Sequence, residues 1–252
     1  MTALLKYAVV LTFVFAVVSL SFMVIKTFFF GRKAQYAKPR GSAGKGILFA
    51  LGKGMMPSEK ESASKHLPTY FAGILYHAGI FAALFYLLSL VLSLGLPGLS
   101  FVSLELPASL ALFLCIVCAV GLLSGVSLVL KRVSLPALRK LSCPDDFAAN
   151  LIVDAFLLLA AMSSYQRFSV SSGALSGSFY SAIAAFNGGS AGAAAGNHLG
   201  GANTLFFVVA VVMFLYVPLG KIRHCFFFFY ARILLGLFYG KRGVWPAPGM
   251  RL

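Results

Sequence analysis

Two histidines stand at otherwise apolar segments, and they are the residues of this chain best suited to bind a metal. His77 lies in the run TYFAGILYHAGIFAALFYLLSLV, and His224 follows FFVVAVVMFLYVP, with Lys221 and Arg223 just before it. Ionisable residues are costly in a membrane segment and therefore indicate a functional site. A bis-histidine haem b takes one imidazole from each of two helices. We therefore predict that His77 and His224 bind the iron of one haem, and that Arg223 and Lys221 meet haem propionates or lipid phosphates.

Three further ionisable residues leave more than one interpretation open. His66, just before the second apolar segment, is predicted to be interfacial, with a quinone headgroup as its alternative partner. Asp154 is the one acid well within a predicted span. It belongs either to a proton path or quinone site, or to an ion pair near the inner interface with Arg139 or Lys140. His198, in the stretch GNHLGG, could reach a second, outer haem if that loop folds inward.

Two of the four cysteines form a CxxC inside an apolar helix. Cys115 and Cys118 lie in LFLCIVCAVGLL, without a second CxxC or a nearby carboxylate. Zinc or an iron–sulfur cluster would need more ligands. We therefore predict that these thiols pack in the apolar phase.

The composition is that of an integral membrane protein. The chain of 252 residues is 60% hydrophobic and 11% charged, whereas a soluble domain is about 45–50% apolar. Only helices or closed barrels satisfy the backbone in lipid, and no segment alternates as barrel strands do. The predicted fold class is all-α, one membrane domain over residues 1–252 with five transmembrane helices. The expected helices are 3–30, 67–95, 108–130, 149–166 and 203–235.

The basic residues predict the orientation of these helices. The formal net charge is +15, but the cations lie between apolar runs, so membrane topology explains them better than nucleic-acid binding. All but Lys6 and Arg167 of the 21 Lys and Arg fall on one side of the predicted bundle. The positive-inside rule then places the N-terminus outside and the C-terminus in the cytoplasm. The expected location is the inner (cytoplasmic) membrane, crossed several times.

Two long loops offer partner surfaces. The basic cytoplasmic loop 31–65, which contains the apolar stretch ILFAL, is either solvated on anionic membrane lipid or a docking surface for a cytoplasmic subunit. The outer loop 167–202 is rich in Gly, Ala and Ser, which is typical of a flexible segment. Its stretch SAIAAF could instead form a short surface helix. The loop is long enough to receive a periplasmic partner such as a multihaem cytochrome.

Four stretches resemble a known family. YHAGI, FLYVPLGKIRH and PDDFAANLIVDAFLLL are similar to the haem-b membrane (gamma) subunit of respiratory nitrate reductase. GLFYGKRGVWP is closer to the cytochrome b subunits of transmembrane redox complexes in sulfate reducers and archaea. The resemblance implies five helices and assigns His77 and His224 to the inner haem. At the family's two outer-haem ligand positions this chain has Leu87 and Phe206, so we predict one haem rather than two.

The expected function is that of a haem-b subunit in a respiratory oxidoreductase complex. It would pass electrons between a quinone-type carrier, menaquinone or methanophenazine, and partner redox subunits such as a cytoplasmic iron–sulfur protein. With no iron–sulfur cysteine pattern and no soluble catalytic domain, the chain is not expected to be catalytic alone. The alternative is a membrane anchor without haem. A transporter is a third reading, which the lack of paired Gly/Pro interruptions disfavours.

Overall fold

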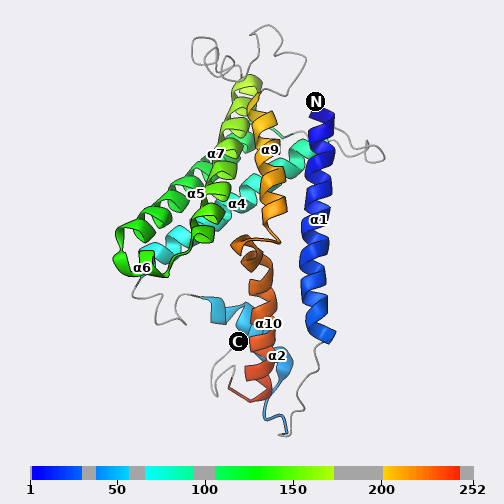
Figure 1. Cartoon of the computed structure of the whole chain (residues 1–252), viewed down its shortest axis with the longest axis vertical. Coiled ribbons are helices and arrows are strands. Elements are labelled where there is room, and N and C mark those ends of the chain that lie inside the picture. The colour runs from blue at the N-terminus through cyan, green and yellow to red at the C-terminus, as the bar shows by residue number, and fades with distance from the viewer. Residues whose placement is uncertain (1, 30–37, 57–65, 94–105, 173–200, 245–252) are drawn as a thin grey trace. The chain divides into compact units, whose positions relative to one another are not determined.

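The computed structural model describes residues 2–29, 38–56, 66–93, 106–172 and 201–244. Every regular element within these ranges is helical, which confirms the all-α prediction (Figure 1). The elements are α1 (Thr2–Phe29), α2 (Ala43–Leu51), η1 (Lys53–Met55), α4 (Leu67–Ser93), α5 (Ala108–Ser134), α6 (Pro136–Leu141), α7 (Pro144–Ser172), α9 (Gly201–Tyr216), η3 (Lys221–Arg223) and α10 (His224–Lys241).

Five of these helical segments are long and apolar enough to cross a membrane. They are α1, α4, α5, α7 and the segment Lys221–Lys241, which contains η3 and α10. The fold is therefore that of a multi-pass membrane protein. The apolar part of α9, Asn203–Tyr216, is shorter, and the whole 16-residue helix rises about 24 Å against a hydrocarbon core of about 30 Å.

The predicted fifth helix, 203–235, was wrong as a single element. The structure ends α9 at Tyr216, passes through a turn and η3, and begins α10 only at His224. Pro218 lies in this turn, where it has no N–H to donate and also disfavours helical geometry at the residue before it. Gly220 is extended, with φ −100° and ψ −169°. His224 is therefore the first residue of a new helix and not a late residue of a continuous one.

The fourth helix begins earlier than predicted because its N-terminus is well formed. Pro144 occupies its first position, and Asp145 and Asp146 follow in the first turn. Proline suits a first helical position, and acidic side chains suit the positive end of the helix dipole. The Asp146 carboxylate also accepts a hydrogen bond from the Cys143 backbone N–H at 2.9 Å. The helix therefore includes the acidic stretch that the apolar pattern alone had left outside it.

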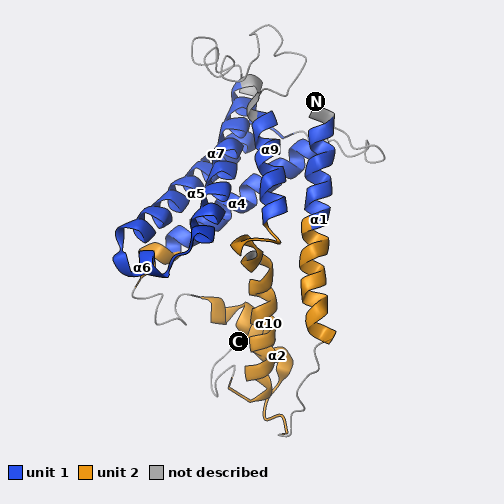
Figure 2. Ribbon diagram, viewed as in Figure 1, with its two compact units in different colours: residues 1–15, 71–216 blue, residues 16–70, 217–252 orange. Residues whose placement is uncertain are grey.

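The chain forms two compact units (Figure 2). Unit 1 comprises residues 1–15 and 71–216, and unit 2 comprises residues 16–70 and 217–252. The positions of the two units relative to one another are not determined.

Unit 1 is a bundle in which α7 packs along both α5 and α9. α4 meets α5 at two glycines, and a Cβ placed on Gly79 would lie only 2.8 Å from the Cα of Gly121. Small residues at such a crossing let two backbones approach closely. The core beyond the crossing is aromatic, because Phe206 of α9 stacks on Phe156 of α7 at 5.0 Å and lies 6.0 Å from Tyr86 of α4.

Unit 2 is built on α10, and it gives the apolar stretch of the loop 31–65 a defined place. Within that loop, ILFAL belongs to α2, and Ser42 caps the N-terminus of this helix, because its side chain accepts a hydrogen bond from the Lys45 backbone N–H. α2 packs on α10 through Gly46, against the GxxxG pair Gly236 and Gly240. The loop is therefore not wholly solvated, because Phe49 and Ala50 of α2 are buried.

Polar contacts fix the ends of the α2–α10 pair. The backbone N–H of Arg40 donates to the Lys241 carbonyl at 2.9 Å. Near the opposite end, the Arg232 guanidinium donates to the Gly54 carbonyl at 2.9 Å and lies over the Phe228 ring. A cation at the end of a short helix satisfies carbonyls that the helix leaves open.

Candidate functional site

His77 projects from the surface of unit 1, in the first half of α4. Its imidazole is exposed, and its Nδ1 lies 2.7 Å from the carbonyl oxygen of Gly73, one turn earlier. The edge of the ring meets the ring of Tyr76, with centroids 6.2 Å apart. Among the described residues, the other nitrogen, Nε2, has no hydrogen-bond partner.

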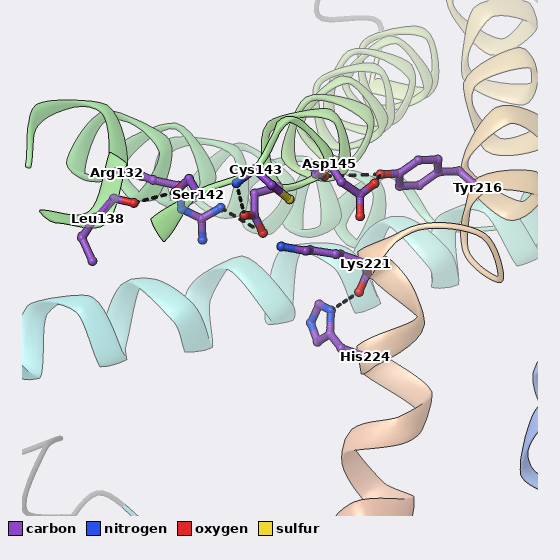
Figure 3. A network of polar contacts seen from close by, with 9 residues as sticks. Arg132, Leu138, Ser142, Cys143, Asp145, Tyr216, Lys221 and His224 are labelled. Carbon is purple, nitrogen blue, oxygen red and sulfur yellow. Dashed lines mark hydrogen bonds and ion pairs between the residues drawn. The ribbon is translucent and has the colours of Figure 1, made fainter. Parts of the chain in front are cut away.

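His224 has the same arrangement on unit 2. It follows η3 directly, its imidazole is exposed, and its Nδ1 lies 2.6 Å from the Lys221 carbonyl oxygen (Figure 3). Its Nε2 also has no hydrogen-bond partner within the described part of the chain. The adjoining Lys221 and Arg223 side chains are exposed too.

This arrangement is the one that a metal-binding imidazole needs. A nitrogen facing a carbonyl must carry the proton, because a carbonyl oxygen can only accept. In a neutral imidazole Nε2 is then the nitrogen without a proton, which is the form that binds a metal, and the Nδ1 hydrogen bond fixes the ring. Both imidazoles have this arrangement, His77 in unit 1 and His224 in unit 2.

Asp154 lies on α7 in unit 1 and is partly exposed, beside a residue that the sequence analysis did not select. Its Oδ1 and the hydroxyl of Tyr76 are both buried, and within the described ranges neither atom has a hydrogen-bond partner. The two side chains are neighbours, because a Cβ placed on Gly125 of α5 would collide with both. Tyr76 on α4, Gly125 on α5 and Asp154 on α7 therefore form one buried polar site.

The predicted pairing of Asp154 with a cation of the α5–α7 connection is not seen among the described residues. Arg139 and Lys140 are exposed, and the ion pair in this region joins Arg132 to Asp146 at 3.7 Å. Figure 3 shows the start of α7, where Asp145 accepts a hydrogen bond from the hydroxyl of Tyr216 on α9. Arg132 therefore pairs with the first turn of α7 and not with Asp154.

The remaining candidates have simple surroundings. His66 is exposed just before α4, and its carbonyl accepts from the backbone N–H groups of Thr69 and Tyr70. Leu87 and Phe206 are buried in the core of unit 1. His198 lies outside the described residues.

The CxxC cysteines behave as packing residues. Cys118 is fully buried, with its Sγ 3.8 Å from the Gly79 carbonyl, and Cys115 is half-buried. No group of three or more His, Cys, Asp or Glu side chains that could hold a metal occurs in the described ranges. This arrangement agrees with the prediction that the two thiols pack in the apolar phase.

Tyr76 and Gly125 are the functional candidates that the sequence analysis missed. Tyr76 adjoins His77, but sequence alone does not say that it faces Asp154. Gly125 is one of several small residues in α5, and only contact with two other helices distinguishes it. Comparison with protein-family models, with curated proteins and with solved structures finds no match to this chain. The resemblance to haem-b subunits therefore remains a prediction.

Proposed function

We propose that this protein is the haem-b membrane subunit of a respiratory oxidoreductase complex. It exchanges electrons between a quinone-type carrier in the membrane and partner redox subunits, through one haem coordinated by His77 and His224. The observation that carries the proposal is the hydrogen bonding of the ring nitrogens of His77 and His224. Each has Nδ1 on a backbone carbonyl of its own turn and Nε2 without a partner in the described part of the chain.

The donor set fits haem b. His77 and His224 would hold the haem iron through Nε2, each with its Nδ1 oriented by a hydrogen bond to a backbone carbonyl. When bound, the haem supplies a one-electron redox centre, and the protein supplies its ligands, orientation and surroundings. Because both rings are exposed on their own units, either can reach a planar group without displacing core side chains.

The residues next to His224 also suit the edge of a haem. Arg223 is exposed immediately before the histidine, and η3 ends at this residue. A guanidinium can make two parallel hydrogen bonds to a carboxylate, so Arg223 is the better candidate for a haem propionate. Lys221 supplies its carbonyl to His224 and can add a second positive charge.

The packing of unit 1 supports one haem rather than two. Leu87 and Phe206 occupy the positions at which the resemblance would place outer-haem ligands. Phe206 is fully buried and stacks on Phe156. A porphyrin there would have to displace this aromatic core, at a cost comparable with the several kcal/mol of a Phe→Ala core substitution.

The carrier and the partners follow from the same proposal. Menaquinone or methanophenazine would exchange electrons with the haem in the membrane. A cytoplasmic iron–sulfur subunit would be the redox partner that exchanges electrons with the haem, and a periplasmic multihaem cytochrome is the other candidate partner. His66 is a candidate for the carrier headgroup, because it is exposed at the start of α4.

The test is a reduced-minus-oxidised visible spectrum with a pyridine haemochrome titration of the purified full chain. We expect one haem b per chain, with loss of most haem in His77→Ala and in His224→Ala. His66→Ala is the matched control, because it removes an exposed histidine near the start of the same helix as His77, and it should retain haem. Two haems per chain would point to His198 as a further ligand. Absence of haem from the wild type would favour the anchor function.

Exogenous imidazole sharpens this test. An alanine at a ligand position leaves space that free imidazole can fill, whereas it cannot repair a misfolded bundle. Recovery of the haem spectrum in both variants with millimolar imidazole would assign the two residues as ligands. Recovery in neither variant, together with unchanged helical content, would contradict the assignment.

A further inference from the structure

The proposed electron path does not use the site formed by Asp154, Tyr76 and Gly125. Burial of its polar atoms without hydrogen bonds nevertheless costs free energy. Asp154 lies well inside α7, a helix apolar enough to span the membrane. Its Oδ1 and the Tyr76 hydroxyl are buried without hydrogen-bond partners among the described residues. A Cβ on Gly125 would collide with both side chains, so a glycine at this position keeps the space that they share.

Within the described ranges, no charged side chain faces Asp154 to balance a carboxylate. The titratable group that faces it is Tyr76 of α4. α5 offers the backbone of Gly125, and Cys118 of the same helix contacts the Gly79 carbonyl instead. On α9, Tyr216 donates its hydrogen bond to Asp145 at the start of α7. An unpaired ion inside a bilayer protein is expensive, so a group in this position is stable chiefly in its neutral form.

A neutral carboxyl also solves the hydrogen-bond problem. Protonated aspartic acid has one O–H donor and retains acceptor capacity, and a tyrosine hydroxyl can both donate and accept. The two groups can therefore satisfy each other, whereas a carboxylate beside a phenol would leave a buried charge. Binding of the proton is simple addition, COO⁻ + H⁺ → COOH, and transfers no electrons.

We infer that Asp154, with Tyr76 as its hydrogen-bond partner in the space kept by Gly125, is an exchangeable proton-binding site, and that it takes up a proton when the haem is reduced. The second part rests on the proposed function. It follows from position, because the Tyr76 ring that faces Asp154 also meets the ring of His77, at 6.2 Å. An added electron makes its surroundings more negative and favours protonation of a nearby acid. One electron at the haem would thus be accompanied by one proton on the Asp154 carboxyl.

Infrared spectroscopy of the full chain tests the proton site without any need for haem. We expect the wild type at neutral pH to show the carbonyl band of a protonated carboxyl, and this band should shift in D₂O. Asp154→Asn, which is nearly isosteric, should lose the band. Tyr76→Phe should move it to higher frequency, because the carbonyl loses its hydrogen bond. Asp145→Asn is the matched control on the same helix and should keep the band unchanged. Identical wild-type and Asp154→Asn spectra would overturn the proposal.

Redox titration of the haem tests the coupling. If one proton is taken up per electron, the midpoint potential changes by about 59 mV for each tenfold change in proton concentration. We expect the wild type to approach this slope over part of the pH range, Asp154→Asn to be flatter there, and Asp145→Asn to follow the wild type. Equal slopes in all three proteins would overturn the coupling. A chain without haem would instead refute the proposed function, and the infrared result would still decide whether Asp154 holds a proton.

Discussion

The crossing of α4 and α5 at Gly79 and Gly121 makes a quantitative prediction. In Gly79→Ala the new Cβ would lie 2.8 Å from the Cα of Gly121 and 3.3 Å from the Val117 carbonyl oxygen. Carbon atoms in contact prefer about 3.5–4.0 Å, so the two helices would have to separate by roughly 1 Å. Neither neighbour is the flexible end of a side chain, and overpacking of this kind typically costs about 1–3 kcal/mol.

A matched variant on the same helix isolates this cost. A Cβ on Gly73 would have no atom within 4 Å, so Gly73→Ala adds the same methyl group without a collision. Both substitutions gain the same helix propensity of up to about 1 kcal/mol, and this gain cancels in the comparison. The free energies of unfolding should therefore differ by roughly 1–3 kcal/mol, which is about 5- to 150-fold in the unfolding equilibrium.

The assay is reversible unfolding of the purified chain in mixed micelles by a denaturing detergent, followed by circular dichroism of the helices. Gly79→Ala should unfold at a lower detergent fraction than the wild type, and Gly73→Ala at the same fraction or a higher one. Because Gly73→Ala keeps the carbonyl that contacts His77 Nδ1, it should also leave the proposed haem binding unchanged. If the two alanine variants unfold together, the close crossing of α4 and α5 is refuted.

Three further substitutions test the two units separately. In unit 2, a Cβ on Gly240 would lie 2.6 Å from the backbone oxygen of Ser42, whereas a Cβ on Gly44 would meet only the Ser42 Oγ at 4.0 Å, an ordinary contact distance. Hydrogen exchange of the α2 amides should therefore be faster in Gly240→Ala than in Gly44→Ala, and equal rates would contradict this packing. Arg232→Met keeps the aliphatic length of the side chain but removes the hydrogen bond to the Gly54 carbonyl of η1. This substitution should lower the free energy of unfolding by about 1–3 kcal/mol. Unchanged stability would show that water replaces the guanidinium. In unit 1, Phe206→Ala removes a fully buried ring and should cost about 3–5 kcal/mol, whereas the adjacent, exposed Leu205→Ala should cost little by the same detergent titration.

The comparison of sequence and structure shows where apolar pattern is informative. It located the first three helices to within four residues and the fourth to within six, because a run of about 20 apolar residues has few stable alternatives to a membrane helix. The apolar pattern did not predict the end of the fifth helix, because the residues on both sides of Pro218 are equally apolar whether or not the helix continues. It also missed α2, because a helix of 9 residues is too short to show a clear period and depends on packing against α10.

The sequence by itself determined that this is an all-helical membrane protein and that His77 and His224 are its metal-binding candidates. Both conclusions depend on residue type alone, since an ionisable side chain in an apolar run is costly wherever the run is placed. Only the tertiary structure decided which polar groups meet. Tyr76 and Asp154 share a site because Gly79, Gly121 and Gly125 let three helices approach. Whether a glycine leaves space for a close approach depends on neighbouring atoms that lie far from it in the sequence, so the sequence alone does not reveal it.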